Sequence, residues 1–405
     1  MQSEMLREFG GDANGRGRHF PPLLQRLRSL ARRTIVNGLY RTGLLNLLRS
    51  IEGSHELLAA PAYALPRLRR SLTSKFGILC YHSVGMEGFP LHSCLAPQVF
   101  EAQMRYLRKH YRIVPLSQLC TEVHDGRSVK PTVAITFDDG YRDLYYYAFP
   151  VLRKYEIPAT IYLIGGCMET GDVPWYDNIF AALDLAPGPK LDVELSSPRQ
   201  FILSGGPARA AVAWEIVCYL RSIPDSERKK WCKDFENRMQ VPQQKLRNRM
   251  LNWEQVRTMN HGEISFGSHT MTHPAVSRLE LADLYDELHR SKELLERGLD
   301  AEIYDFAYPF GKPGDCGVNL DKYLADCGYR SAVTTVEGFN SADANLYSLR
   351  RLQIGDDSSM AEFALRMSRN FLNRVEEQRV SSDASCNSLI AKKVQAARAR
   401  ASDGD

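Results

Sequence analysis

Short apolar runs alternate with longer helical stretches along most of this sequence, and this alternation limits the fold more than any other feature. Strands buried on both faces, as in a parallel sheet, have such runs of apolar, β-branched and aromatic residues. Four leucines between the later runs (Leu281, Leu284, Leu288 and Leu295) recur at helical spacing, and a helix end is expected near Gly298. The chain is therefore predicted to be an α/β protein, with either a barrel or an open sheet. The six predicted strands are Gly77–Tyr81, Thr132–Phe137, Ala159–Ile164, Ile264–Gly267, Ile303–Ala307 and Ser331–Thr334.

The chain divides into three predicted parts. The main domain spans residues 73–372, and a segment of about residues 171–249 interrupts the alternation as a predicted helical insertion. Residues 1–72 are an N-terminal extension that begins with a stretch of disordered composition. Within it, residues 22–49 have the leucine and arginine pattern of a basic amphipathic helix, which could lie on an anionic membrane surface or pack on the main domain. Residues 373–405 are a polar C-terminal tail.

Composition narrows the class of protein. The 405 residues have a net charge of only +4, which does not favour a nucleic-acid binder. The nine cysteines are scattered and form no C-x-x-C pair, which argues against a disulfide framework and fits a reducing compartment. The N-terminus lacks the apolar run of a signal peptide, and no stretch is apolar enough to span a bilayer. We therefore expect a cytoplasmic protein, with peripheral contact to the inner membrane surface through residues 22–49 as an option.

Two adjacent aspartates follow directly on one predicted strand. In TVAITFDDG the strand runs into Asp138, Asp139 and a glycine. Functional groups of α/β folds gather at the carboxyl ends of strands. Two carboxylates in a poorly hydrated site repel each other unless a cation or protons intervene. A bound metal is the simplest remedy, because one carboxylate can then bind it while the other handles a proton. A plain Asp-Gly turn is the alternative interpretation.

Two histidines end another apolar run, in FGSHTMTHP. Pro274 disfavours a helical conformation at His273, so His269 and His273 are predicted to lie in a loop. Thr270 stands where a helical H-E-x-x-H site would have its glutamate, so the base must come from elsewhere, and the aspartate pair offers one. Two imidazoles and one carboxylate make a three-ligand set that leaves positions open for water and substrate. Hydrogen-bonded turn residues are the alternative.

A third run, YDFAYPFG, ends in a turn without a charged group. Tyr308, Pro309, Phe310 and Gly311 form this turn. Because proline fixes its own backbone, it can aim the Phe310 N–H at an oxyanion. Taken alone, the stretch is only a strand-ending turn.

Together these motifs resemble those of the polysaccharide deacetylase family, carbohydrate esterase family 4. TFDDG, SHTMTH, ELHRSKELLE and FAYPFG occur in the order of the family, and the resemblance covers roughly residues 75–372. It implies a distorted (β/α) barrel and a divalent metal, most often zinc, with cobalt or nickel as alternatives. It also implies Asp138 as the general base, Asp139, His269 and His273 as metal ligands, and the Phe310 N–H in the oxyanion hole.

The chain departs from the family pattern in two places. Many members carry an arginine in the third motif, where this chain has Ala307 and Tyr308, so the orientation of Asp138 must rest on other groups. Many also carry a catalytic histidine on a late strand, and this chain reads SLRRLQIGDD there. His82, at the end of the first predicted strand, is the replacement candidate for the acid that protonates the leaving amine, as in the branch that deacetylates exported or biofilm polysaccharides. A structural histidine is the alternative.

Further candidate site residues have weaker support in the sequence. Tyr308 and Trp175 are predicted to contact substrate; Trp175 could stack on a sugar ring or belong to the core. Arg142 and Asp177 are weaker site candidates, and Asp143 is expected to cap the helix after the aspartate pair.

The sequence thus predicts a metal-dependent hydrolase that removes N-acetyl groups from a carbohydrate through attack of water on the acetyl carbonyl. A cytoplasmic enzyme of this kind could act on a sugar nucleotide, an oligosaccharide or a lipid-linked saccharide. Two alternatives stay open: an amide hydrolase with a non-sugar substrate, and a catalytically inactive carbohydrate-binding homologue.

Overall fold

The computed structural model describes residues 76–86, 94–126, 131–240, 246–262, 264–355 and 359–367. The chain divides into two compact units, one of Gly53–Phe363 and one of Met1–Glu52 with Ala364–Asp405. Almost all described residues belong to the first unit, which contains every described strand. The predicted N-terminal extension (1–72), with its basic helix, and the predicted C-terminal tail (373–405) lie outside the described residues. In the described part of the chain, no helix is long and apolar enough to cross a membrane.

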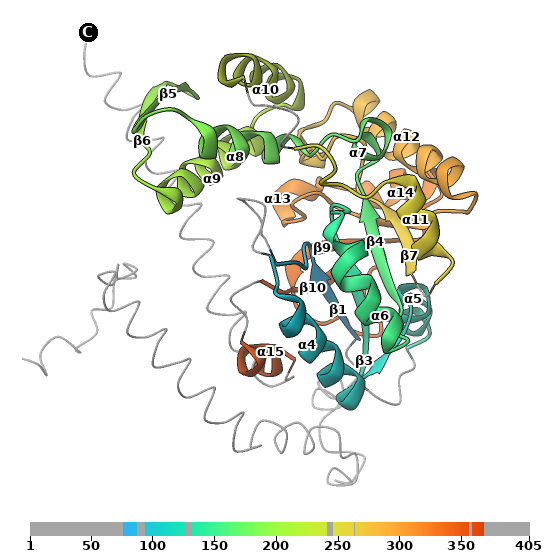
Figure 1. Cartoon of the computed structure of the whole chain (residues 1–405). Helices are drawn as coiled ribbons and strands as arrows, with labels where there is room; N and C mark the ends of the chain where they lie inside the picture. Colours follow the sequence, from blue (N-terminus) through green and yellow to red (C-terminus); the bar gives the residue numbers. More distant parts are fainter. Residues whose placement is uncertain are drawn as a thin grey trace, which may run out of the picture. The chain divides into compact units, whose positions relative to one another are not determined.

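Parallel strands close into a seven-stranded barrel (Figure 1). Closure comes from β1 and β3, which pair along their whole length, from Phe76 opposite Thr132 to Tyr81 opposite Phe137. A short strand β2 (Arg112–Ile113) pairs with the first two residues of β3, Thr132 and Val133. The order around the barrel is β1 (Phe76–Tyr81), β10 (Leu349–Gln353), β9 (Ser331–Glu337), β8 (Asp305–Ala307), β7 (Ile264–Ser268), β4 (Ala159–Leu163) and β3 (Thr132–Phe137).

All six predicted strands are present, with ends that differ by a few residues, and the predicted α/β barrel is confirmed. Strands β1, β3 and β4 are buried at every residue, as expected for apolar runs without alternation. Strand β10 was not among the predicted strands because its sequence, LRRLQ, contains two adjacent arginines. Arg351 is nevertheless fully buried.

Helices lie outside the strands (Figure 1). Helix α12 shows why: Leu284, Leu288 and Leu295 are buried on one face, as their spacing predicts. The helix ends at Leu299, one residue beyond Gly298. Gly298 is required by packing, since a Cβ there would lie 2.0 Å from the Trp253 ring. The main helices around the barrel are α4 (Pro97–His110), α5 (Leu116–Asp125), α6 (Phe149–Lys154), α11 (Trp253–Asn260), α12 (Leu281–Leu299) and α14 (Leu320–Asp326). Shorter helical segments are η3 (Leu144–Ala148), α7 (Gly165–Thr170), η5 (Val276–Arg278), α13 (Pro313–Cys316) and α15 (Met360–Arg366).

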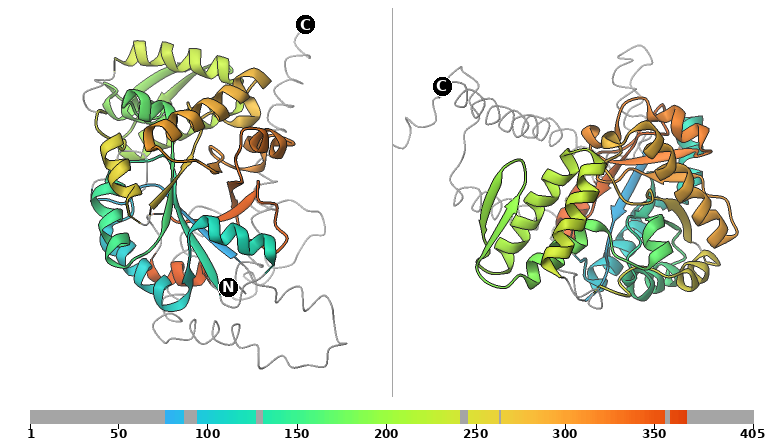
Figure 2. Two further views of the ribbon diagram at one scale, coloured as in Figure 1. Left: turned by 90° about the vertical axis from the view of Figure 1, so that its right-hand side faces the viewer. Right: turned by 90° about the horizontal axis from the view of Figure 1, so that it is seen from above.

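The segment between α7 and α11 forms a layer at one end of the barrel (Figures 1 and 2). It contains helices as predicted, and also an antiparallel hairpin of strands β5 (Lys190–Glu194) and β6 (Pro198–Ile202). The segment has its own hydrophobic cluster, which includes Phe180 and Ile216. The indole N–H of Trp175 donates to the His273 carbonyl at 3.0 Å, which ties the layer to the loop after β7. Its elements are α8 (Trp175–Leu185), β5 (Lys190–Glu194), β6 (Pro198–Ile202), α9 (Gly206–Ser222) and α10 (Asp225–Met239).

Candidate active site

The predicted site residues follow the carboxyl ends of four barrel strands. His82 comes after β1, Asp138 and Asp139 after β3, and His269 after β7. The turn that contains Phe310 comes after β8. Because all these strands are parallel, their carboxyl ends lie at the same end of the barrel. The closed sheet therefore brings together motifs that lie far apart in the sequence.

Asp138 is held by Arg351, a residue that the sequence motifs did not identify as part of the site. The two terminal nitrogens of Arg351 donate to the two carboxylate oxygens of Asp138, each at 2.6 Å. The Arg351 Nε–H donates to the Thr334 carbonyl at 2.8 Å, which fixes the plane of the guanidinium. Both Arg351 and Asp138 are buried. The structure thus supplies, from β10, the orienting group that the third motif lacks.

The pair also fixes the charge of Asp138. Burial alone would raise the pKa of this carboxyl, but the Arg351 guanidinium outweighs burial and holds the pKa well below its usual range. Asp138 is therefore ionised at neutral pH. A weak signal for this partner exists in the sequence, because a buried carboxylate without the arginine of the third motif needs a cation from another strand.

Asp139, His269 and His273 form a compact cluster of potential metal ligands. One ligand atom from each lies within 4.8 Å of the others. The Nε2 atoms of both histidines lie 3.5 Å from Oδ1 of Asp139. All three side chains are buried. Two imidazole nitrogens and a carboxylate oxygen at such separations fit a divalent cation of the zinc type.

The electrostatics of the two imidazoles suit metal binding. Nδ1 of His269 lies 2.7 Å from the Ala307 carbonyl, a contact that requires a proton on Nδ1 and leaves the Nε2 lone pair toward Asp139. Burial lowers the pKa of His269. Burial, with the charge of His269, lowers the pKa of His273 well below its usual value. Both rings are therefore neutral at neutral pH, which is the form that binds metals.

The loop between the two histidines is held by a glutamate of helix α12. Glu287 accepts hydrogen bonds from the backbone N–H groups of Met271 and Thr272, both at 2.8 Å, and from the Thr272 hydroxyl at 2.6 Å. His273 has a positive φ of 55°, so the predicted non-helical loop is confirmed. Since few residues adopt this conformation unaided, the contacts of Glu287 stabilise a strained ligand loop.

The aspartate pair occupies a similarly tight turn. Asp139 has a φ of 71° and Gly140 a φ of 80°. A Cβ at Gly140 would lie 2.6 Å from Cδ2 of Leu163, so only glycine fits there. The turn places the carboxylates of Asp138 and Asp139 toward different partners.

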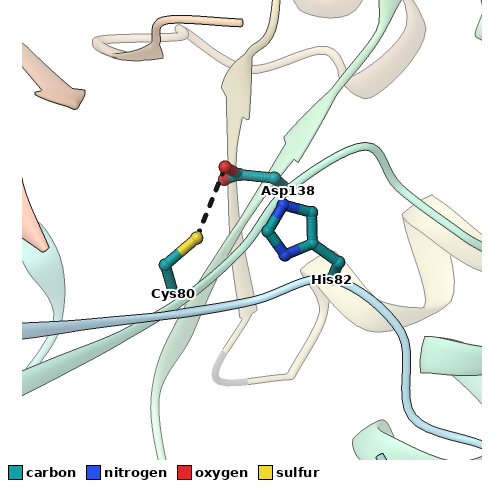
Figure 3. Close-up of side chains that lie close together, drawn as sticks. All are labelled: Cys80, His82 and Asp138. Atoms are coloured by element: carbon teal, nitrogen blue, oxygen red, sulfur yellow. Dashed lines mark hydrogen bonds between the residues drawn. The ribbon is translucent and has the colours of Figure 1, made fainter. Parts of the chain in front are cut away.

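His82 and Cys80 lie beside Asp138 (Figure 3). Ligand atoms of Cys80, His82 and Asp138 also lie within 4.8 Å of one another, and the Cys80 thiol donates to Oδ2 of Asp138 at 3.4 Å. A cation here would be repelled by Arg351, whose guanidinium already occupies both oxygens of Asp138. The cluster with Asp139 is therefore the better metal site. The imidazole of His82 lies within 4.8 Å of a carboxylate oxygen of Asp138, and its role as an acid stays a prediction.

Phe310 has a backbone suited to its predicted role. Its φ is 58°, and the Thr335 hydroxyl donates to its carbonyl. Among the described residues, none accepts a hydrogen bond from the Phe310 N–H. The Phe310 ring packs edge-on against His273, with 4.9 Å between the ring centroids. The Phe310 ring thus contacts one residue of the ligand cluster, and a role of the N–H in an oxyanion hole stays a prediction.

The other candidates have structural contacts. Tyr308 is buried, and its hydroxyl donates to the Tyr347 carbonyl at 3.0 Å. Trp175 is buried at 8% exposure, with the Arg228 guanidinium over its ring at 4.8 Å. A contact of either residue with substrate stays a prediction.

Three weaker candidates also have defined places. The carboxylate of Asp177 accepts from the Tyr141 hydroxyl at 2.9 Å and is fully buried. Arg142 lies beside the aspartate turn. The expected capping role of Asp143 is wrong: its side chain makes no capping bond to η3 and instead accepts a hydrogen bond from Ser83. The reason is the closure of the barrel, which brings the loop after β1 against the loop after β3.

Comparison with known proteins is consistent with this geometry. Residues 125–332, just over half of the chain, match the sequence model of the polysaccharide deacetylase family. YxkH of Bacillus subtilis, whose name assigns it to the polysaccharide deacetylases, is 24% identical over 292 residues, which cover 72% of this chain and 75% of that protein. The poly-beta-1,6-N-acetyl-D-glucosamine N-deacetylase of Staphylococcus epidermidis is 40% identical over 68 residues, which cover 16% of this chain and 24% of that protein.

A solved structure has the same fold. The deacetylase PplD of Streptococcus pyogenes, in complex with acetate, superposes with a TM-score of 0.50 at 22% identity, over 73% of this chain and 99% of that one. The family match, together with a barrel that carries a cluster of metal-ligand residues, confirms the predicted family and reaction class. This chain belongs to the polysaccharide deacetylases, metal-dependent hydrolases of N-acetyl groups on carbohydrates.

Proposed function

We propose that this chain removes acetyl groups from N-acetylhexosamine units of a poly- or oligosaccharide, with its chemistry centred on Asp138 and Asp139. One observation supports this most strongly. The ligand cluster of Asp139, His269 and His273 lies next to a carboxylate that Arg351 keeps ionised and fixed. A three-ligand set and a base on adjacent residues are the parts that water-driven hydrolysis of an amide needs.

Zinc is the proposed metal, held by Asp139, His269 and His273, and cobalt or nickel could bind the same donors. A bound divalent cation supplies a Lewis acid that polarises the acetyl carbonyl and lowers the pKa of water. The protein contributes the preformed ligand geometry. Glu287 and the Ala307 carbonyl hold the loop and the ring of His269 in place before the metal binds.

Residues of the chain carry out the remaining steps of the proposed reaction. Asp138 takes a proton from the water whose oxygen adds to the acetyl carbon. The Phe310 N–H donates to the oxygen that becomes negatively charged in the tetrahedral intermediate. His82 donates a proton to the amine nitrogen as the C–N bond breaks, which leaves acetate and a free amino sugar. The rings of Phe310 and Trp175 help to exclude bulk water, since both pack at this end of the barrel.

The substrate class rests on the relatives. The staphylococcal enzyme is named for poly-β-1,6-N-acetylglucosamine, so N-acetylglucosamine polymers or oligomers are the proposed substrates, and a role in exopolysaccharide synthesis follows. Lipid-linked saccharides are a further option through the sequence of residues 22–49, which we propose to contact the inner membrane surface. Liposome flotation that is unchanged by deletion of residues 1–60 would remove the membrane part of this proposal.

Two other functions use the same residues differently. A non-sugar amide could enter the same centre, because the chemistry acts on the acyl group. A carbohydrate-binding protein without activity is disfavoured, since Asp138 is present and Asp139, His269 and His273 form one cluster of potential metal ligands. We also propose the domain bounds that the sequence predicts, with residues 73–372 as the deacetylase domain and residues 171–249 as its insertion.

A substrate panel tests the proposal. Zinc-loaded protein is incubated with β-1,6- and β-1,4-linked N-acetylglucosamine oligomers, with an O-acetylated oligomer and with a cyclic amide, and the released carboxylate is measured. Release of acetate from at least one N-acetylglucosamine oligomer, well above that from the other two substrates, supports the proposal. Turnover of the cyclic amide alone would assign the chain to a non-sugar hydrolase.

A further inference from the structure

A pocket of about 370 Å³ lies beside the proposed centre and has no place in the proposed reaction. Three segments line it: the stretch after β1, the stretch after the aspartate turn, and residues 248–249. Its most prominent side chains are Met86, Arg142, Tyr146, Tyr147 and Arg249. The volume is within the range of pockets that bind small ligands.

Backbone contacts place this pocket next to the centre. The Gly140 carbonyl, one residue beyond Asp139, accepts from the Leu251 N–H at 2.9 Å. The Arg142 N–H donates to the Arg249 carbonyl at 2.8 Å, which joins the two chain segments that carry these arginines. On the other wall, Ser83 directly follows His82. The pocket is therefore lined by the two chain segments that directly follow His82 and the aspartate turn.

The lining combines cationic and aromatic groups. Within the described ranges, no carboxylate oxygen lies within 4.0 Å of the Arg142 guanidinium, which instead lies over the Tyr146 ring at 5.7 Å. Arg249 is exposed. Tyr146 is 54% exposed and Tyr147 37%, so their rings are open to a ligand. Guanidinium groups bind carboxylates and phosphates through two parallel hydrogen bonds, and aromatic faces pack against sugar rings.

Asp143 is the one acidic residue in the lining. The Oδ2 atom of Asp143 accepts a hydrogen bond from the Ser83 hydroxyl. Its Oδ1 atom is buried. Asp143 thus contacts Ser83 on the wall formed by the stretch after β1, although it directly follows Arg142 in the chain.

We propose that this pocket is a subsite for an anionic group, a carboxylate or a phosphate, on the saccharide unit adjacent to the one that is deacetylated. The inference rests on the proposed function of the Asp138–Asp139 centre, because the pocket gains its role from the sugar bound there. Among saccharides that contain N-acetylglucosamine, the preferred substrate is then one that carries a carboxylate or a phosphate next to the unit that is deacetylated.

The proposed anion subsite is tested by the KM values for three matched oligosaccharides. These are a neutral N-acetylglucosamine tetramer, a tetramer that alternates N-acetylglucosamine with glucuronate, and an N-acetylglucosamine tetramer with 6-phosphates. The wild-type protein should have a KM for at least one charged tetramer about three- to tenfold below that for the neutral one, with less difference at high salt. The glucuronate and phosphate arms show which anion is bound. Equal KM values for all three would overturn the proposal.

Variants assign the preference to the pocket. Arg142→Gln and Arg249→Gln should bring the ratio of charged to neutral KM toward one, whereas Arg153→Gln, at an exposed arginine on α6 outside the lining, should leave the ratio as in the wild type. A preference for the charged tetramers that survives when Arg142→Gln and Arg249→Gln are combined in one protein contradicts the assignment.

Binding separates this proposal from the proposed function. Calorimetry with Asp138→Asn protein measures affinity for the same tetramers without turnover. A preference for the charged tetramers that is lost in Arg142→Gln supports the subsite even if no acetate is ever released. Equal affinity for charged and neutral tetramers contradicts the subsite even if the enzyme is an active deacetylase.

Discussion

Arg351 on strand β10 and Asp138 after strand β3 form a buried pair in which two parallel hydrogen bonds of 2.6 Å join guanidinium to carboxylate. Strand β1 lies between these two strands in the barrel. The pair therefore depends on barrel closure and spans 213 positions of the sequence. It explains how Asp138 stays oriented without the arginine of the third motif.

Replacement of Arg351 by methionine should raise the pH at which activity is lost in acid. Burial raises the pKa of Asp138 and Arg351 lowers it, so burial acts unopposed in the variant. Asp138 then takes up a proton at higher pH, and the acidic limb of the kcat/KM profile moves upward. Arg351→Lys retains the positive charge but cannot make the two parallel hydrogen bonds. Its acidic limb should therefore lie between those of the wild type and Arg351→Met.

Loss of one partner of a buried pair also destabilises the fold by about 3–5 kcal/mol. Circular dichroism must therefore confirm that the Arg351 variants are folded at the assay temperature. A folded Arg351→Met protein with an unshifted acidic limb would show that Arg351 does not control the ionisation of Asp138.

Loss of Glu287 should weaken metal binding without removing a ligand. Its carboxylate holds two backbone N–H groups and one hydroxyl of the loop that joins the two histidines. Glu287→Ala is expected to lower the zinc affinity about 10- to 100-fold. Glu293→Ala is the matched control, because Glu293 lies on the same helix, is exposed and pairs with His289 away from the ligand loop. Competition with a chromophoric chelator measures both; equal affinities for the two variants would exclude the supporting role.

His82 can be tested through the leaving group. If His82 protonates the departing amine, His82→Ala should slow amide hydrolysis about 10²–10⁴-fold. Hydrolysis of p-nitrophenyl acetate should fall far less, because that leaving group departs without a proton. A structural histidine would produce similar losses for both substrates, together with a lower melting temperature.

Cys80 should be chemically inert although it contacts Asp138. Burial raises the pKa of its thiol well above the usual range, and its side chain has no exposure. Iodoacetamide at neutral pH should leave Cys80 unmodified in the folded protein, while the exposed Cys218 reacts. Mass spectrometry of the alkylated peptides provides the measurement, and rapid labelling of Cys80 would show that the centre opens more than the structure indicates.

Much of the barrel could be predicted because its strands are apolar, short and buried on both faces. The same patterns placed Asp138, Asp139, His269 and His273 at strand ends, where parallel pairing brings them together. Local sequence is sufficient in these cases because each signal lies within a few residues.

Residues that act across the barrel were harder to predict. Arg351 lies in LRRLQ, which does not have the pattern of a buried strand, and nothing near it identifies Asp138 as its partner. Glu287 falls on a helix whose periodic leucines explain its fold but not its contact with the histidine loop. The wrong capping role of Asp143 has the same origin, since Ser83 reaches it only once the barrel has closed.

In the proposed mechanism Asp138 takes a proton from water and Asp139 binds the metal. This separation of roles between adjacent aspartates is the central feature of the mechanism. Zinc content and acetate release should be measured together for wild type, Asp138→Asn and Asp139→Asn, each stripped of metal and reloaded. Asp138→Asn should bind one zinc ion but release almost no acetate, whereas Asp139→Asn should lose both the zinc and the activity. Full activity in Asp138→Asn, or unchanged zinc binding in Asp139→Asn, would contradict the mechanism.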